Sequence, residues 1–138
     1  MADTIRKLDY FAAQIPDKPG EAVRILQALK NDSVSLVAFS GFPSGKNKAQ
    51  LDFVPENPEA LKAAAKKIKL KLGAKKSCFV IQGDDRVGAL TDTLTRLAEA
   101  KVNITASQAV TAGMGRFGAI FWVKSRDLNK AAKLLNAT

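Results

Sequence analysis

Two short segments with one residue pattern offer the clearest chemistry in the chain. The first turn reads Asp17-Lys18-Pro19-Gly20, and the second turn reads Asp85-Arg86-Val87-Gly88. Each lies where an apolar run gives way to an amphipathic segment, so unpaired backbone N–H groups and a helix N-terminus would favour an anion such as a carboxylate there. Glycine would let that ligand approach the main chain. The alternative, that aspartate caps each turn and glycine only permits tight packing, stays open.

Several other chemistries are excluded by the residues that the chain lacks. Its 138 residues contain no histidine and a single cysteine, Cys78. Ser-His-Asp and Cys-His catalysis, imidazole zinc sites and an internal disulfide are therefore ruled out. The neighbouring carboxylates Asp84 and Asp85 point differently on an extended chain, which disfavours an acid–base pair. We expect no enzyme activity, cofactor or metal.

The net charge of +9 is concentrated in one stretch, residues 60–76, which holds seven lysines and no acid: Lys62, Lys66, Lys67, Lys69, Lys71, Lys75 and Lys76. Such a stretch could bind the phosphates of a nucleic acid. The favoured interpretation is the solvated face of an alanine-rich helix. Nucleic-acid binding is the alternative function.

Two glycine-rich segments match nucleotide-binding patterns only superficially. Residues 113–118 read Gly-Met-Gly-Arg-Phe-Gly, but an apolar strand follows where the dinucleotide motif needs a helix. Residues 41–47 are one residue short of a phosphate loop and lack its final Ser or Thr. Both are predicted to be hairpin turns.

An internal repeat in the sequence helps to predict the helices and strands around the two turns. Shifting the sequence by 68 positions aligns Phe11 with Phe79, the first turn with the second, and Phe53 with Phe121. The register is predicted to hold without a gap as far as residues 62–64, aligned with 130–132. Two homologous halves are the simplest explanation.

Each half is predicted to have the order β-α-β-β-α. The strands are residues 10–15, 34–38 and 49–54, and in the second half 77–82, 102–106 and 117–123. The first helices are 21–30 and a segment from Val87, and the second helices begin after the caps Asn57-Pro58 and Ser125-Arg126-Asp127.

A fourth strand in each half is left undecided. Residues 67–72 alternate with period two, which fits a strand, but they also fit the end of a helix capped by Gly73. Beyond the last helix only Asn136-Ala137-Thr138 remain, so the second half either lacks this strand or receives one from elsewhere. A missing edge strand would invite pairing between halves or chains.

These features together resemble the ACT domain, a small amino-acid-binding regulatory module with βαββαβ order. The resemblance rests on the two turns, on the leucines of the helices that follow them, and on Val102-Asn103-Ile104 at the start of a strand. It covers both halves from about residue 8. In that family the glycine loop, the following helix start and the beginning of the second strand meet across a module interface and hold a free amino acid.

The resemblance implies ligand-binding residues in both halves. In the second half they are Asp85, Arg86, Val87, Gly88, Ala89, Asn103 and Ile104. In the first half they are Asp17, Pro19, Gly20 and Ser35. The first half departs from the second by having Ser35 in place of Asn103 and Glu21 in place of Ala89. Since Glu21 adds negative charge beside the carboxylate site, the second site is favoured.

We therefore predict an α+β fold of two ferredoxin-like ACT units in tandem, residues 1–73 and 74–138, with antiparallel sheets and helices on one face. The predicted function is non-catalytic regulation through a small amino acid or related carboxylate. The expected partners are this effector, a second copy of the chain and a regulated protein, with a purely structural dimerisation unit as a further alternative. No stretch reaches the roughly 18 apolar residues of a membrane span, so a cytoplasmic protein is expected.

Overall fold

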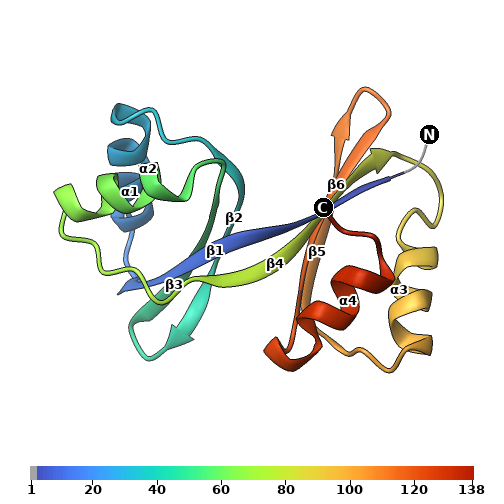
Figure 1. Cartoon of the computed structure of the whole chain (residues 1–138). Coiled ribbons are helices and arrows are strands. Elements are labelled where there is room, and N and C mark those ends of the chain that lie inside the picture. The colour runs from blue at the N-terminus through green and yellow to red at the C-terminus, as the bar shows by residue number, and fades with distance from the viewer. Residues whose placement is uncertain (1–2) are drawn as a thin grey trace. The chain divides into compact units, whose positions relative to one another are not determined.

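The structure is a computed structural model that describes residues 3–138 (Figure 1). The first half contains β1 (Thr4–Pro16), α1 (Glu21–Asn31), β2 (Leu36–Gly45), β3 (Lys48–Pro55) and α2 (Pro58–Lys67). The second half contains β4 (Lys76–Asp84), α3 (Thr91–Glu99), β5 (Ile104–Gly113), β6 (Arg116–Val123), a 3-10 helix (Ser125–Asp127) and α4 (Leu128–Leu134). The predicted α+β class is confirmed. Within residues 3–138, no helix has the length and apolar character needed to cross a membrane.

The chain divides into two compact units. One consists of residues 9–76, and the other of residues 77–138 together with the described residues 3–8. We call residues 9–76 the N-terminal unit and the other group the C-terminal unit. The division falls within β1, so the first residues of this strand belong to the C-terminal unit and the rest to the N-terminal unit. This grouping differs from the expected division after residue 73 mainly through those N-terminal residues. The expected domain boundary itself stays a prediction.

The N-terminal unit has its strands in the order β2-β3-β1, with antiparallel pairing. Phe53 of β3 lies opposite Phe11 of β1, and both side chains are fully buried. Both helices lie on one face of these strands (Figure 1). Helix α1 buries Ile25 and Leu29, which are four residues apart and so share one face.

The C-terminal unit repeats this plan with the order β4-β6-β5. Phe79 lies opposite Phe121, and their rings stack with centroids 5.0 Å apart. Leu97 of α3 and Ala131 of α4 are fully buried in the same core. The duplicated phenylalanine pairs are thus the centres of two equivalent cores.

The 68-residue repeat holds through the strands but not through the last helices. The backbone N–H of Leu70 bonds to the carbonyl of Ala65, and that of Ala137 bonds to the carbonyl of Ala132. These equivalent bonds are 67 positions apart, so the gapless alignment of residues 62–64 with 130–132 is wrong by one. The second half is one residue shorter than the first between β6 and α4, where it makes a 3-10 turn.

Both nucleotide-like segments are hairpins, as predicted. Gly45 pairs with Lys48 and Gly113 pairs with Arg116, which leaves two residues in each turn. Most of the glycine-rich residues extend the strands, so the turns are shorter than expected. In the second hairpin both turn residues have positive φ, a backbone shape that glycine adopts freely.

The two predicted N-caps differ in outcome. Asn57 caps α2, since its Oδ1 accepts from the N–H groups of Glu59 and Ala60 at 3.0 and 3.4 Å. The cap predicted at residues 125–127 is wrong. Those residues form the 3-10 turn, and α4 has no side-chain cap bond.

The ambiguous segment after α2 is neither helix nor strand. Helix α2 ends at Lys67, and Lys69, not Gly73, takes the left-handed conformation that ends it (φ +57°). Ile68, Leu70 and Leu72 then pack on the core, which explains their period-two alternation. In the other unit an extended segment does come from elsewhere: the N–H of Lys7 bonds to the carbonyl of Thr138, and the N–H of Thr138 bonds to the carbonyl of Ile5.

Candidate functional site

The second turn is fixed at both of its ends. Strand β4 ends at Asp84, and the N–H of Asp85 donates to the carbonyl of Gly115 in the β5–β6 hairpin at 2.8 Å. Gly88 has φ +70°, which an L side chain rarely adopts. Helix α3 begins at Thr91 rather than at Val87, so the predicted helix start is wrong. The intervening residues form tight turns.

Three consecutive backbone N–H groups of the second turn are unbonded. Those of Arg86, Val87 and Gly88 donate to no residue between 3 and 138, and all three residues are exposed. By contrast, the N–H groups of Ala89 and Thr91 bond back to the carbonyls of the turn. A run of free N–H groups in a tight turn carries positive partial charge and favours an anion.

An open hollow of about 380 Å³ lies beside this turn, between the start of α3 and strand β5. Its apolar lining is formed by Ala89, Leu90, Leu94, Ala109, Val110 and Phe117. Asp85, Thr91 and Thr111 add polar groups. The Asp85 carboxylate bonds to no other residue of the described chain, so it is available to a cation. The hollow is therefore lined by the free N–H of Gly88, one free carboxylate and an apolar surface, and the free N–H groups of Arg86 and Val87 precede Gly88 in the turn.

Arg86 does not line the hollow, and its side chain stabilises the turn through hydrogen bonds. Its guanidinium donates to both carboxylate oxygens of Asp3, at 3.1 and 3.2 Å, and to the carbonyls of Asp84 and Ala89. The bonded Asp3 carboxylate raises the pKa of Arg86 above its usual value. A Cβ at Gly83 would overlap the Asp3 carboxylate and crowd the Phe117 ring, so a side chain at this position would displace Asp3 from its place beside Arg86.

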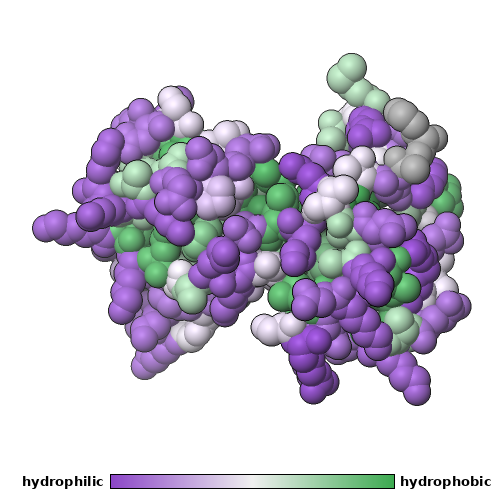
Figure 2. Space-filling model, viewed as in Figure 1, coloured by the Kyte–Doolittle hydropathy of each residue, from purple (hydrophilic) through white to green (hydrophobic). Residues whose placement is uncertain are grey.

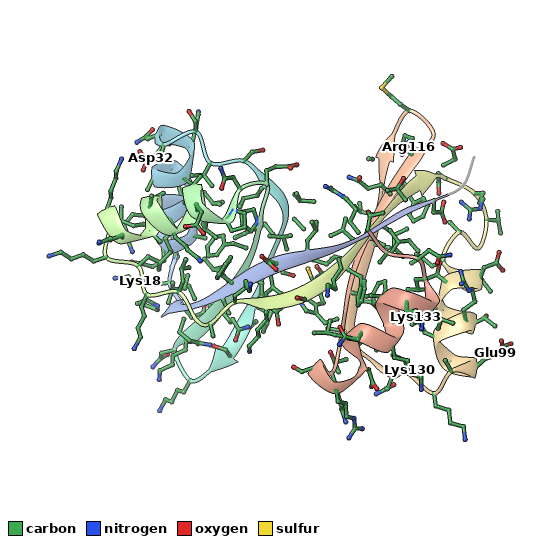
Figure 3. All side chains as sticks on the ribbon, viewed as in Figure 1. Lys18, Asp32, Glu99, Arg116, Lys130 and Lys133 are labelled. Atoms are coloured by element: carbon green, nitrogen blue, oxygen red, sulfur yellow. The ribbon has the colours of Figure 1, made fainter. Side chains whose placement is uncertain are left out.

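A second ion pair closes the base of the turn. Arg116 at the start of β6, labelled in Figure 3, donates to Asp84 Oδ1 at 2.8 Å. This bond lowers the pKa of Asp84 below its usual value. Sequence reasoning missed both pairs, because Asp3 and Arg116 are far from the turn along the chain.

The remaining predicted residues of this half lie apart from the hollow. Val87 is fully exposed and does not line it. Asn103 and Ile104 follow the C-terminal end of α3, whereas Gly88 precedes its N-terminal end. A nine-residue helix is about 13 Å long at 1.5 Å per residue. One unit therefore brings together Asp85, Gly88 and Ala89 but keeps Asn103 and Ile104 at a distance.

The first turn shares the backbone frame but not the donors. The N–H of Asp17 bonds to the carbonyl of Asn47 at 3.0 Å, which matches the bond of Asp85. The N–H of Lys18 bonds to the carbonyl of Pro16, and Pro19 has no N–H group. Positions 18–20 correspond to positions 86–88 of the second turn. Among them only Gly20, with φ +91°, has an N–H group that donates to no residue of the described chain.

The first turn also carries its own anion. Helix α1 begins at Glu21, directly after Gly20, whose carbonyl accepts from the N–H of Arg24. The Glu21 carboxylate forms ion pairs with Lys18 at 3.7 Å and with Arg24 at 3.3 Å, and only 16% of its side chain is exposed. A ligand carboxylate here would meet this fixed negative charge.

Ser35, the fourth residue predicted in the first half, lies at the opposite end of α1. It lines a separate hollow of about 480 Å³ with Leu29, Lys30 and Val34. Its place relative to the first turn matches that of Asn103 relative to the second. The structure thus keeps the turn residues and the strand-start residues apart in both halves.

Comparisons with known proteins give structural matches alone. No family model matches the sequence, and no curated protein does either. A crystal structure of a protein from Bacteroides thetaiotaomicron is 16% identical, with a TM-score of 0.79 over 97% of this chain and 88% of that chain. The ligand-free regulatory subunit of aspartate kinase from Thermus thermophilus is 14% identical, with a TM-score of 0.67 over 99% of this chain and 95% of that chain.

A third match supports the same fold. The regulatory subunit of aspartate kinase from Thermus flavus is 18% identical, with a TM-score of 0.59 over 98% of this chain and 94% of that chain. The chain thus shares the fold of these aspartate kinase regulatory subunits, which agrees with the predicted ACT resemblance at the level of the fold. At such low identity the likeness shows the fold alone.

Proposed function

We propose that this chain is a non-catalytic regulatory protein that binds a small amino acid or a related carboxylate at the second turn. The observation that carries the proposal is the run of three free N–H groups at Arg86, Val87 and Gly88, beside an open hollow. The regulatory role is supported by the fold that the chain shares with aspartate kinase regulatory subunits.

The ligand would be held by complementary charges. Its carboxylate would accept hydrogen bonds from the free N–H groups of the turn, and its ammonium group would face the Asp85 carboxylate. Because Ala89, Leu94 and Phe117 line the hollow, a small apolar side chain fits better than a charged one. Arg86 contributes by holding the turn in shape through Asp3.

A second module would complete the site. Asn103 and Ile104 are too far along α3 to reach the ligand from the same unit, so we propose that another module supplies them, with a homodimer as the expected assembly. Strand β5 pairs only with β6 among the described residues, and its other edge is open to a partner. Binding across such an interface would favour one arrangement of modules by the difference in affinity between states.

A thermal-shift screen against the twenty amino acids tests this proposal. A ligand present at a hundred times its dissociation constant should stabilise the protein by about 2.7 kcal/mol. Asp85→Asn should remove most of the shift, since it removes the proposed partner of the ammonium group. The matched control Asp17→Asn should leave the shift unchanged.

The opposite results are equally informative. If no amino acid raises the melting temperature, the proposal of an amino-acid ligand is wrong. A stable dimer in sedimentation analysis with no ligand response would then favour the structural dimerisation alternative. Equal losses in the two aspartate variants would contradict the assignment of the ligand to the second turn alone.

A further inference from the structure

A second surface, unrelated to the second turn, lies on the N-terminal unit. We call it the lysine hollow: an open depression of about 420 Å³ beside α2 and the segment that follows it, both green in Figure 1. Its lining residues are Lys62, Ala65, Lys66, Lys69, Leu70, Lys71 and Leu72. Four lysines therefore surround a floor of alanine and leucine side chains.

The end of α2 explains how these lysines meet. The chain reverses at Lys69, whose φ of +57° ends the helix, and the N–H of Leu70 bonds back to the carbonyl of Ala65 at 2.9 Å. This reversal brings Lys69 and Lys71 beside the lysines of α2. Leu70 also packs against the core, so the segment has a fixed position.

The positive charge of the hollow is largely uncompensated. Lys66, Lys69 and Lys71 are exposed and form no ion pair with any residue from 3 to 138. The Lys62 Nζ lies 3.5 Å from Glu59 Oε1. The same Nζ lies over the Phe11 ring, 5.5 Å from the ring centroid. Figure 2 shows hydrophilic residues over most of the visible face of this unit, with apolar patches between them.

The internal repeat shows that the fold does not require these lysines. In the register of the last helices, Lys62, Lys69 and Lys71 correspond to Asn129, Asn136 and Thr138. The apolar positions, in contrast, are retained, with Ala65 matched by Ala132 and Ile68 by Leu135. The three extra charges therefore need an explanation other than folding.

We propose that the lysine hollow docks an acidic amphipathic segment of a partner protein. Carboxylates on one face of such a segment would pair with the lysines, and its apolar side chains would cover Ala65, Leu70 and Leu72. A nucleic acid fits less well, because single-stranded bases need exposed aromatic rings to stack on. No aromatic residue lines the hollow, and Phe11 beneath Lys62 is only 2% exposed.

Fluorescence anisotropy on the full chain tests this inference. The probe is a labelled 14-residue helical peptide with glutamates on one face and leucines on the other. The variant K62N/K69N/K71T installs the residues of the second repeat, and asparagine tolerates the left-handed backbone at position 69. The control K101N/K124N/K130T removes the same charge from exposed sites elsewhere. Melting curves confirm that both variants fold.

We expect the peptide to bind in a salt-sensitive manner, and the hollow variant to weaken binding by about tenfold or more while the control changes it less than about threefold. A peptide with glycine in place of leucine should bind more weakly. The inference is overturned if the peptide does not bind, or if both triple variants lose affinity equally. It is also overturned if a 14-nucleotide RNA binds the hollow more tightly than the peptide, which would favour the nucleic-acid alternative.

Discussion

The first and second turns share one backbone plan and differ in what they offer to a ligand. In both, the aspartate N–H bonds to the carbonyl of the neighbouring hairpin, and a glycine with positive φ follows three residues later. The second turn leaves three consecutive N–H groups free, whereas the first uses one internally and loses another to proline. Two copies of a motif can therefore keep their backbone shape while only one keeps a run of free N–H donors.

The helices after the turns extend this difference. Helix α1 starts directly after Gly20 and places Glu21 at its N-terminus. Helix α3 starts only at Thr91, so the residues between it and Gly88 form the wall of a hollow. The late start of α3 thus creates space where the first unit has a paired acidic side chain.

The cores, unlike the turns, are expected to respond alike to mutation. Phe53 and Phe121 occupy the same position in the two units and are 0% and 2% exposed. Replacing either with alanine should cost about 3–5 kcal/mol, since each substitution leaves a large cavity. Chemical denaturation of the two single variants measures this. A cost below about 1 kcal/mol for one of them would break the equivalence of the cores.

The second helices should respond unequally. Asn57→Ala removes a side-chain cap that accepts two N–H groups, so it should cost about 1 kcal/mol. Ser125→Ala should cost less than about 0.5 kcal/mol, because Ser125 makes no cap bond. Denaturation midpoints of the two variants provide the comparison. Equal costs would contradict the difference seen between α2 and α4.

Much of the fold could be predicted because the repeat let each half check the other. Phe11 and Phe79 mark equivalent strands, and the hairpins follow from alternating strands around short glycine turns. The last helices were misaligned because Lys-Ala-Ala occurs in both at positions one residue out of register. A short alanine-rich match carries little information, whereas backbone bonds define the register directly.

The candidate site could be predicted only in part. Asp85, Gly88 and Ala89 line the hollow, as a glycine turn between strand and helix suggests. The role of Arg86 was not accessible, because its partner Asp3 is 83 residues away and no local pattern links them. The β5 residues of the hollow were missed for the same reason, since strand pairing and helix placement bring them to the turn.

The proposed function requires that the second turn, and not the first, receives the ligand. Ligand-induced thermal shifts of Gly88→Val and Gly20→Val measure it most directly. A Cβ at Gly88 would lie 3.2 Å from Thr91 Oγ1 at the hollow, whereas one at Gly20 would meet nothing within 4 Å. Both substitutions strain a backbone of positive φ, so they serve as mutual controls for stability. We predict that Gly88→Val loses the shift and Gly20→Val retains it, and the reverse pattern would contradict ligand binding at the second turn.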